Sequence, residues 1–291
     1  MDVKCRIFDI YLFVSKGLSG NLKLNYSSDA FIGTADYYVR YRIPYPKVLL
    51  DDLIKRSNLP PQCKLLDLAS GPGRISIPLA PYFSKVWAND AEPEMIAAGK
   101  REAGKAGIKN IEWLLGKAEE LELESNSIDL ITIGEAFHRL NQNTVSKLAL
   151  DWLKPGSHIA LIGCHSIFRG EKPWHKAVYD IVHKWTSHDS SNEGESSERR
   201  KLREAKHYKL ILEENGFMEC NNYSFTIKHY WSAKSIIGYL YSTSVCSKRV
   251  IGDKSDEFEA EIKSALEKIN KHDKFLDDIQ CGYTLGKKPL C

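Results

Sequence analysis

Apolar runs alternate with amphipathic helical patterns along the middle of the chain. The runs expected to form strands are Lys64–Leu68, Lys85–Asn89, Ile111–Leu115, Ile128–Ile133 and His158–Cys164. The helical patterns between them cover Ile75–Tyr82, Glu92–Ala106 and Gln142–Leu153, and Lys154-Pro155-Gly156 stops the last one. This alternation predicts an α/β fold with a doubly wound, mostly parallel sheet.

The pattern changes after Cys164. Helices are expected over Pro173–Trp185, Leu202–Asn215, Ala233–Ser244 and Asp256–Asn270, and strands over Phe217–Tyr230 and Ile279–Leu285. The segment Thr186–Arg200 is polar and predicts a solvent-exposed loop or flap. We therefore expect an N-terminal extension over residues 1–28, a core over 29–165, and a cap over 166–291 that also supplies the last strands of the sheet.

The first predicted strand breaks into the glycine turn Gly71-Pro72-Gly73, and the acid Asp90 ends the second strand. Glycines let a ligand approach the backbone, and a carboxylate can accept both hydrogen bonds of a ribose diol. A dinucleotide-binding turn would have a third glycine where Ser76 stands, and Asp67 would repel a phosphate. The pattern therefore favours a nucleoside that carries a cationic or amino group.

The run Asp67-x-Ala69-x-Gly71-x-Gly73 resembles motif I of the class I S-adenosylmethionine-dependent methyltransferases, which is usually D-x-G-x-G-x-G. Ala69 replaces the first glycine, which weakens the expectation of a left-handed backbone there. The resemblance continues in the family's order through Asp90, the helix opening Ala91–Met95 and the loop Gly116–Leu121, where Lys117 replaces a common acid. It implies a Rossmann-like fold with a helical cap, S-adenosylmethionine as cofactor and S-adenosylhomocysteine as product.

An aromatic and basic segment, Phe31–Pro46, precedes the first strand. It resembles the A-x-x-Y-x-x-x-R-P-x-Y-P segment of a methyltransferase subgroup, with Ile43 in place of the first proline. A guanidinium from Arg42 and a phenol from Tyr38 suit the carboxylate of the cofactor's methionine. The alternative is a helix face that packs over the sheet. The expected cofactor-binding residues are Tyr38, Arg42, Asp67, Ala69, Gly71, Gly73, Asp90, Ala91, Met95, Ala118, Glu119 and Gly134.

Catalytic candidates follow the fourth predicted strand, because the carboxyl ends of parallel strands border the ligand crevice. The run Ala136-Phe137-His138-Arg139 resembles the family's F-H-W, with Arg139 for Trp. His138 could take a proton from the acceptor and Glu135 could orient it, although a bracing role for His138 is an equal alternative. Asp67 as a turn cap, Met95 as a core residue and Glu119 as a solvated acid are the corresponding alternatives.

The distal segment Gly238–Ser244 resembles the G-Y-L-x-S-T-S sequence of the same subgroup, and helices before the last strand would shape an acceptor pocket. Its expected walls are Tyr45, Trp174, Trp231 and Tyr241, although aromatic residues at helical spacing are more often core.

Composition narrows the class of partner. The net charge of +3 gives no reason to expect nucleic acid, and the apolar run Ile10–Val14 is too short to cross a membrane. The seven cysteines lie far apart without a C-x-x-C pair, which predicts free thiols, no metal site and a cytoplasmic protein. The oligomeric state is not predicted.

The sequence thus predicts an S-adenosylmethionine-dependent methyltransferase that acts on a small-molecule acceptor by O-, N- or C-methylation. Methylation of a protein or RNA is the alternative within the class. A nucleotide-dependent oxidoreductase or a catalytically silent, cofactor-binding scaffold is the alternative from another class.

Overall fold

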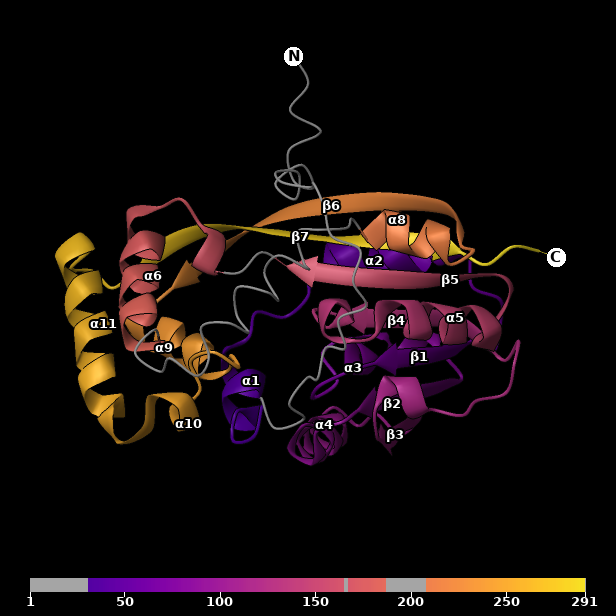
Figure 1. The fold of residues 1–291 in the computed structure, drawn as a ribbon, viewed down its shortest axis with the longest axis horizontal. Coiled ribbons are helices and arrows are strands. Elements are labelled where there is room, and N and C mark those ends of the chain that lie inside the picture. Colours follow the sequence, from indigo (N-terminus) through magenta and orange to yellow (C-terminus); the bar gives the residue numbers. More distant parts are fainter. Residues whose placement is uncertain (1–30, 165–166, 187–207, 291) are drawn as a thin grey trace, which may run out of the picture.

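The computed structural model describes residues 31–164, 167–186 and 208–290. The predicted extension 1–28, nearly all of the polar segment 186–200, and residues 202–207 of one predicted helix lie outside these ranges. The centre of the molecule is a sheet of seven strands in the order β3-β2-β1-β4-β5-β7-β6 (Figure 1). The strands are β1 (Lys64–Leu68), β2 (Lys85–Asp90), β3 (Ile111–Leu115), β4 (Ile128–Gly134), β5 (Leu153–Cys164), β6 (Met218–Trp231) and β7 (Phe275–Lys287).

Strands β1 to β5 run parallel, and this confirms the predicted doubly wound, mostly parallel Rossmann-like sheet. Strand β7 is antiparallel to both β5 and β6, so the sheet ends in an antiparallel pair. Because the order reverses between β1 and β4, their carboxyl ends border a crevice where ligands bind in open α/β sheets.

Helices cover both faces of the sheet because successive strand side chains point to opposite faces. Leu65 of β1 packs in the same core as Leu49 and Leu53 of α2 (Lys47–Ser57). The next residue, Leu66, belongs to a second core that α5 (Gln142–Trp152) and α8 (Tyr208–Glu214) complete. Helices α3 (Ser76–Leu79) and α4 (Pro93–Lys105) follow β1 and β2.

The remaining described helices form a cap beyond one end of the sheet (Figure 1). They are α1 (Ala35–Tyr41), α6 (Pro173–Thr186), α9 (Ala233–Tyr241), α10 (Lys248–Ile251) and α11 (Ser255–Ile269). Helix α6 packs against α11, with the rings of Trp185 and Phe258 centred 5.6 Å apart. Buried aliphatic side chains such as Val178 and Ile262 fill the space between the two helices.

Strand β7 joins the cap to the sheet. Its residues Cys281–Lys287 pair with β5 on one side and with β6 on the other, whereas Phe275–Gln280 pair with β6 alone. Strands β6 and β7 therefore extend beyond the rest of the sheet as a two-stranded ribbon that ends at the cap helices.

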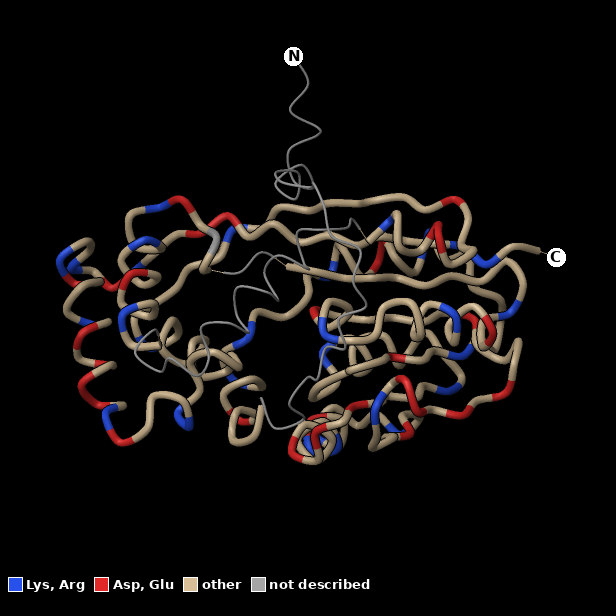
Figure 2. The backbone as a smooth tube through the Cα atoms, viewed as in Figure 1, with Lys and Arg blue, Asp and Glu red and all other residues tan. Residues whose placement is uncertain are grey.

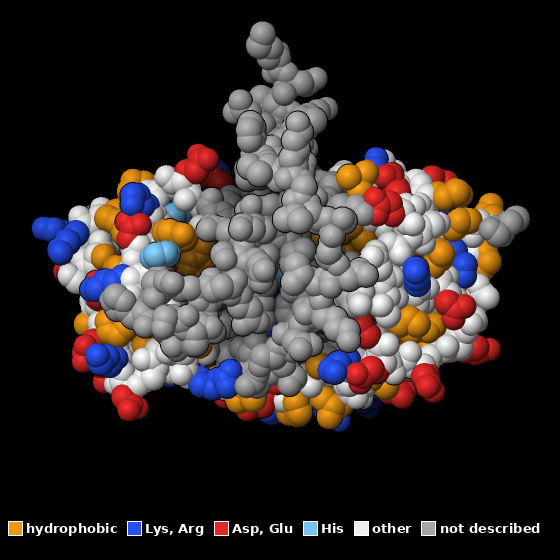
Figure 3. Space-filling view, viewed as in Figure 1, with side chains coloured by type: hydrophobic (Ala, Val, Ile, Leu, Met, Phe, Trp, Pro, Cys, Tyr) orange, Lys and Arg blue, Asp and Glu red, His pale blue; other side chains and the backbone are white. Residues whose placement is uncertain are grey.

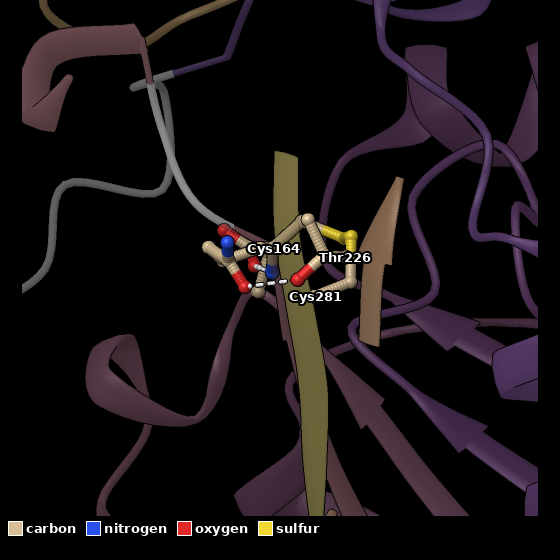
Figure 4. Close-up of a disulfide and its surroundings, with 5 residues drawn as sticks. Cys164, Thr226 and Cys281 are labelled. Atoms are coloured by element: carbon tan, nitrogen blue, oxygen red, sulfur yellow. Dashed lines mark hydrogen bonds between the residues drawn. A yellow bond between two sulfur atoms is a disulfide. The ribbon is translucent and has the colours of Figure 1, made fainter. Parts of the chain in front are cut away.

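The cysteines correct one prediction. Cys164 and Cys281 form a disulfide at the pair of residues where β5 stops accompanying β7, and Thr226 of β6 lies beside it (Figure 4). Spacing along the chain gave no sign of this bond, because the two residues are 117 positions apart and only strand pairing brings them together. Cys63, Cys220 and Cys246 are free and buried, and Cys5 and Cys291 lie outside the described residues.

Within the described ranges, no helix is both long and apolar enough to cross a membrane. Basic and acidic residues are interspersed along the tube (Figure 2).

Candidate functional site

The glycine turn after β1 has a left-handed backbone. Ala69, Gly71 and Gly73 have φ angles of 50°, 56° and 81°. Ala69 thus adopts the conformation that the family's glycine would favour, although its side chain makes that conformation costly. Gly73 is needed for a second reason, because a β-carbon there would lie 2.7 Å from the indole of Trp113.

Asp67 is fully buried beneath this turn, where its carboxylate accepts three hydrogen bonds. Oδ2 accepts from the Ser76 backbone N–H at 3.1 Å and from the Ser76 hydroxyl at 2.5 Å, and Oδ1 accepts from the Thr132 hydroxyl at 2.8 Å. Burial raises the pKa of Asp67 to about 6, against the opposing effect of these hydrogen bonds. Asp67 therefore holds the turn and also gives the adjacent pocket a negative charge at neutral pH.

Asp90 stands at the carboxyl end of β2 and faces the turn. Its two oxygens accept hydrogen bonds from the backbone N–H groups of Gly71 (2.7 Å) and Glu92 (2.9 Å). Burial raises the pKa of Asp90, while these amides and the Arg139 guanidinium favour its charged form. A carboxylate oxygen can accept more than one hydrogen bond, so Asp90 can also accept from a ribose diol. The site therefore fits a nucleoside.

The predicted adenine-side residues follow β2 and β3, whose ends meet where the Gly116 backbone N–H donates to the carbonyl oxygen of Asp90 at 3.0 Å. Met95 and Ala118 are buried, with Met95 in a small cluster with Ala35 and Ala98, and Ala91 is exposed. The Glu119 carboxylate accepts a hydrogen bond from the Asn141 backbone N–H at 2.8 Å, at the N-terminus of α5. This contact holds the loop after β3 against the start of α5.

Arg42 bonds to the cap, and its predicted contact with the cofactor stays a prediction. Its Nε and Nη2 donate to the hydroxyl and the carbonyl oxygen of Ser242, at 2.8 and 3.3 Å, so it links α1 to the end of α9. The guanidinium also stacks on Tyr38, 4.8 Å from the ring centre. Tyr38 borders the ligand pocket described next, whereas the guanidinium of Arg42 is held by the cap.

A pocket opens beside the glycine turn, and the sequence analysis did not name three of its lining residues, Ser70, Ile75 and Arg74, as site residues. Of these, Arg74 carries a charge. The sequence feature that could have identified Arg74 is its position directly after Gly73, where a helix was expected to begin. The lining residues are Tyr38, Tyr45, Asp67, Ala69, Ser70, Arg74, Ile75 and Gly134. The pocket thus joins the predicted cofactor turn to the segment before α2.

The catalytic candidates follow β4. Glu135 has a φ of 56°, and its carboxylate accepts a hydrogen bond from the Cys164 backbone N–H at the end of β5. His138 lies in the single-turn helix Phe137–Arg139 and is partly buried. The structure therefore places both at the carboxyl edge of the sheet, and their catalytic roles stay predictions.

Three predicted acceptor-pocket residues pack inside the cap instead of lining the described pocket. Trp174, Trp231 and Tyr241 are 4%, 2% and 1% exposed. Trp231 donates to Asp277 at 3.2 Å, and the Tyr241 hydroxyl bonds to Glu259 at 3.2 Å. These contacts hold Trp231 and Tyr241 inside the cap, and Trp174 packs there with its ring centre 6.0 Å from that of Phe275. In the described part of the chain, no cluster of His, Cys, Asp or Glu could hold a metal ion.

Comparison with known proteins finds methyltransferases that this chain resembles over part of its length. Residues 65–156 match a family model described as a methyltransferase domain. An uncharacterized methyltransferase of Mycobacterium bovis is 29% identical over 125 residues, which cover 43% of this chain and 48% of that protein. The chain thus spans about half the length of the curated relatives it matches first.

Two solved structures share the fold. A putative type II methyltransferase from Anaeromyxobacter dehalogenans has a TM-score of 0.59 at 19% identity, with 86% of this chain and 98% of that chain covered. Phosphoethanolamine N-methyltransferase 2 of Haemonchus contortus, in complex with phosphomonomethylethanolamine and S-adenosylhomocysteine, has a TM-score of 0.51 at 15% identity, with coverage of 89% and 57%. These two likenesses show that the fold is shared.

Proposed function

We propose that this chain transfers a methyl group from S-adenosylmethionine to a small-molecule acceptor. The observation that carries the proposal is Asp90, whose carboxylate ends β2 and is bonded to the glycine turn after β1, at the strand end where an acid can accept from a ribose diol. The family match covers the same segment of the chain.

The residues present fit the cofactor along its length. Asp90 would hold the ribose hydroxyls, and the buried Met95 and Ala118 would lie on the side of the base. The positive φ angles at Gly71 and Gly73 bring the backbone close to a ligand. The negative charge of Asp67 suits the amino or sulfonium group at the other end.

The acceptor is proposed to be small because the cap stands over the carboxyl edge of the sheet. Helices α6, α9 and α11 are packed together there, with α1 against α9 (Figure 1). Where side chains are described on the face in Figure 3, apolar, acidic and basic groups are interspersed, which gives no argument for a nucleic-acid surface. The substrate of the Haemonchus contortus enzyme is also a small molecule.

Methyl transfer mainly requires that acceptor and donor are aligned, because the methyl group on a sulfonium is already electrophilic. Glu135, fixed by the Cys164 backbone N–H, would orient the acceptor or favour a cationic one. His138 would accept the proton released by a hydroxyl or amine.

Calorimetry with the purified chain tests the cofactor. We expect S-adenosylmethionine and S-adenosylhomocysteine to bind, and a wild-type protein that binds neither would overturn the proposal. NADH serves as the control ligand, because its binding in their place would identify an oxidoreductase instead.

The acceptor class needs a second measurement. A cell extract incubated with the protein and methyl-labelled S-adenosylmethionine is separated by size, and label is expected in the low-molecular-mass fraction. Label in protein or RNA would replace the small-molecule assignment. A protein that binds the cofactor but labels no fraction would favour a silent scaffold. Location in the cytoplasm is part of this proposal, and fractionation of cells checks it.

A further inference from the structure

The disulfide between Cys164 and Cys281 lies at the edge of the sheet that carries the catalytic candidates. Cys164 is the last residue of β5, and its backbone N–H donates to the carboxylate of Glu135. Glu135 is held to the same strand a second time, because its own backbone N–H donates to the carbonyl oxygen of Ile162 at 2.9 Å. The position of Glu135 therefore depends on the position of the last residues of β5.

The other half of the disulfide belongs to the ribbon that leads to the cap. Cys281 is the first residue of β7 that pairs with β5, and on its other side it pairs with Phe225 of β6. The bond thus ties the strand end that holds Glu135 to the base of the ribbon (Figure 4).

Strands β5 and β7 do not depend on this bond to stay together. Six residue pairs, from His158–Lys287 to Gly163–Gly282, already join the two strands in an antiparallel ladder. The two cysteines are the next pair, at the end of the ladder. Breaking the bond would leave the six pairs in place, and its effect would fall on the end of β5, where Glu135 is bound.

The cysteines differ in their access to a reductant. Cys164 is partly exposed, whereas Cys281 is 2% exposed, so a reductant reaches Cys164 first. The free cysteines of the described ranges, Cys63, Cys220 and Cys246, are buried. Burial raises the pKa of all three thiols, to about 11 for Cys220 and about 12 for Cys246. Because the thiolate is the nucleophile in exchange, these three are poorly suited to attack the disulfide.

We propose that Cys164 and Cys281 form a reversible redox site, with a dithiol as reductant, that controls the acceptor side of the site, where Glu135 and His138 lie. The inference rests on the proposed function and on the proposed location in the cytoplasm, where disulfides are usually transient or redox-sensing. The closed bond holds the end of β5, and with it the Glu135 carboxylate. When the bond is open, the two sulfur atoms must separate to van der Waals contact, which moves the end of β5 and weakens its hold on Glu135.

The exchange is a two-electron reduction. A thiolate of the dithiol attacks Sγ of Cys164, the S–S bond breaks, and Cys281 leaves as a thiolate that takes up a proton. The second thiolate of the reductant then attacks the reductant's own sulfur in the mixed disulfide, and Cys164 leaves and is protonated in turn. The products are two cysteine thiols and the oxidised dithiol, and an oxidised partner reverses both steps.

The test compares protein reduced with dithiothreitol and protein oxidised with glutathione disulfide, at one pH. Hydrogen exchange at the Cys164 amide, read by mass spectrometry, should become roughly 10-fold faster on reduction, because the amide loses its charged acceptor. Methyl label in the low-molecular-mass fraction should fall roughly 10-fold, for the same loss of position at Glu135. The affinity for S-adenosylhomocysteine should change less than about twofold, since Asp90 and the glycine turn belong to β1 and β2. Re-oxidation should restore both values.

The variant Cys281→Ser imitates the reduced state and should show fast exchange and low transfer with either reagent. Cys63→Ser is the matched control, because a hydroxyl can keep the hydrogen bond that its Sγ donates to the carbonyl oxygen of Tyr82. This control should respond to the two reagents as the wild type does. If Cys281→Ser does not fold, as judged by thermal unfolding, Cys164→Ser takes its place.

Thiol labelling of the native protein shows whether dithiothreitol opens the bond. A bond that opens only after unfolding would overturn the proposal, and so would a reduction that leaves either the Cys164 exchange or the methyl transfer unchanged. If neither redox state methylates any fraction, the proposed function fails. Faster exchange at Cys164 on reduction would then still support the redox site, and unchanged exchange would overturn it.

Discussion

The carboxylate of Asp90 accepts a hydrogen bond from the backbone N–H of Gly71, 2.7 Å away, so the acid of β2 that we propose as the ribose ligand also holds the glycine turn after β1. The two elements are parallel neighbours in the sheet, and the bond joins their carboxyl ends. Occupation of the site by a ribose and the order of the turn are therefore coupled.

This coupling predicts two effects of Asp90→Ala. The variant should bind S-adenosylhomocysteine at least roughly 100-fold more weakly, because charged hydrogen bonds contribute about 1.5 to 3 kcal/mol each. It should also lose about 1 to 3 kcal/mol of unfolding free energy, since the Gly71 and Glu92 amides lose their acceptor. Calorimetry and urea unfolding measure these. Asp36→Ala, which removes an exposed carboxylate of α1 that pairs with Arg101, is the control, and equal affinity in both variants would contradict a ribose contact.

Asp67 predicts an unusual pH dependence of stability. Its pKa is about 6 in the folded protein and 3.8 when unperturbed, so the folded state holds the proton more tightly. The free energy of unfolding should therefore fall as pH rises from about 4 to 6, by about 3 kcal/mol for this group, and stay lower above pH 6. Asp67→Asn should remove this part of the slope in urea unfolding between pH 4 and 8. An identical slope in both proteins would disprove the assignment.

The affinity for a cationic ligand should also depend on the titration of Asp67. It should rise with pH over the range in which the free energy of unfolding falls. Below pH 6 Asp67 becomes neutral, and a cationic ligand loses an attractive charge. The affinity for S-adenosylmethionine should fall as pH drops from 7 to 5, and calorimetry on the wild type and Asp67→Asn checks it. A pH dependence that survives in the variant would assign the effect to another group.

Alanine substitutions at two glycines of helix α4 should have opposite effects on the stability of the protein. At Gly99 a β-carbon would lie 2.2 Å from the Trp113 ring, whereas at Gly104 it would meet nothing within 4 Å. Gly99→Ala should therefore cost about 1 to 3 kcal/mol through overpacking, and Gly104→Ala should gain up to about 1 kcal/mol of helix stability. Thermal unfolding of the pair tests this, and a destabilising Gly104→Ala would show that the helix is not as described.

The Cys164–Cys281 disulfide predicts a redox-dependent stability. It closes a loop of 117 residues, for which chain entropy predicts about 3 to 5 kcal/mol. Cys281→Ser should lose this amount in urea unfolding without reductant, and dithiothreitol should bring wild type and variant to nearly equal stability. Thiol counting on the unfolded, non-reduced protein provides the control. An unchanged wild-type curve with reductant would mean that the bond does not form.

The sheet could be predicted from the sequence because its strands are buried on both faces and read as continuous apolar runs. Predicted and observed bounds of β1 and β3 coincide, and those of β2 and β4 differ by one residue. Helix α2 was not predicted, because its signal, Leu49, Leu50 and Leu53 at helical spacing after Pro46, was hidden by the aromatic segment before it. No pattern within the sequence of β7 itself indicates that this strand pairs antiparallel to its neighbours.

The candidate site likewise contains residues that the sequence could place and residues that it could not. Asp67, Gly71 and Asp90 could be placed because their positions follow from strand ends. The partners of Arg42 could not, since Ser242 is 200 residues away and belongs to the cap. As a residue type, tryptophan is typical of a ligand pocket. The burial of Trp174 and Trp231, which the sequence does not show, places them in the interior of the cap.

The ribbon formed by β6 and β7 determines how the cap can move. From Phe275 to Gln280 two strands run without a third, so bending there breaks no hydrogen bonds to a neighbouring strand. The disulfide lies at the next residue, where the ribbon meets β5. The disulfide ties β7 to β5 at that point, so a bend of the ribbon on the cap side would leave the pairing of β5 with β7, and the Cys164 bond to Glu135, in place.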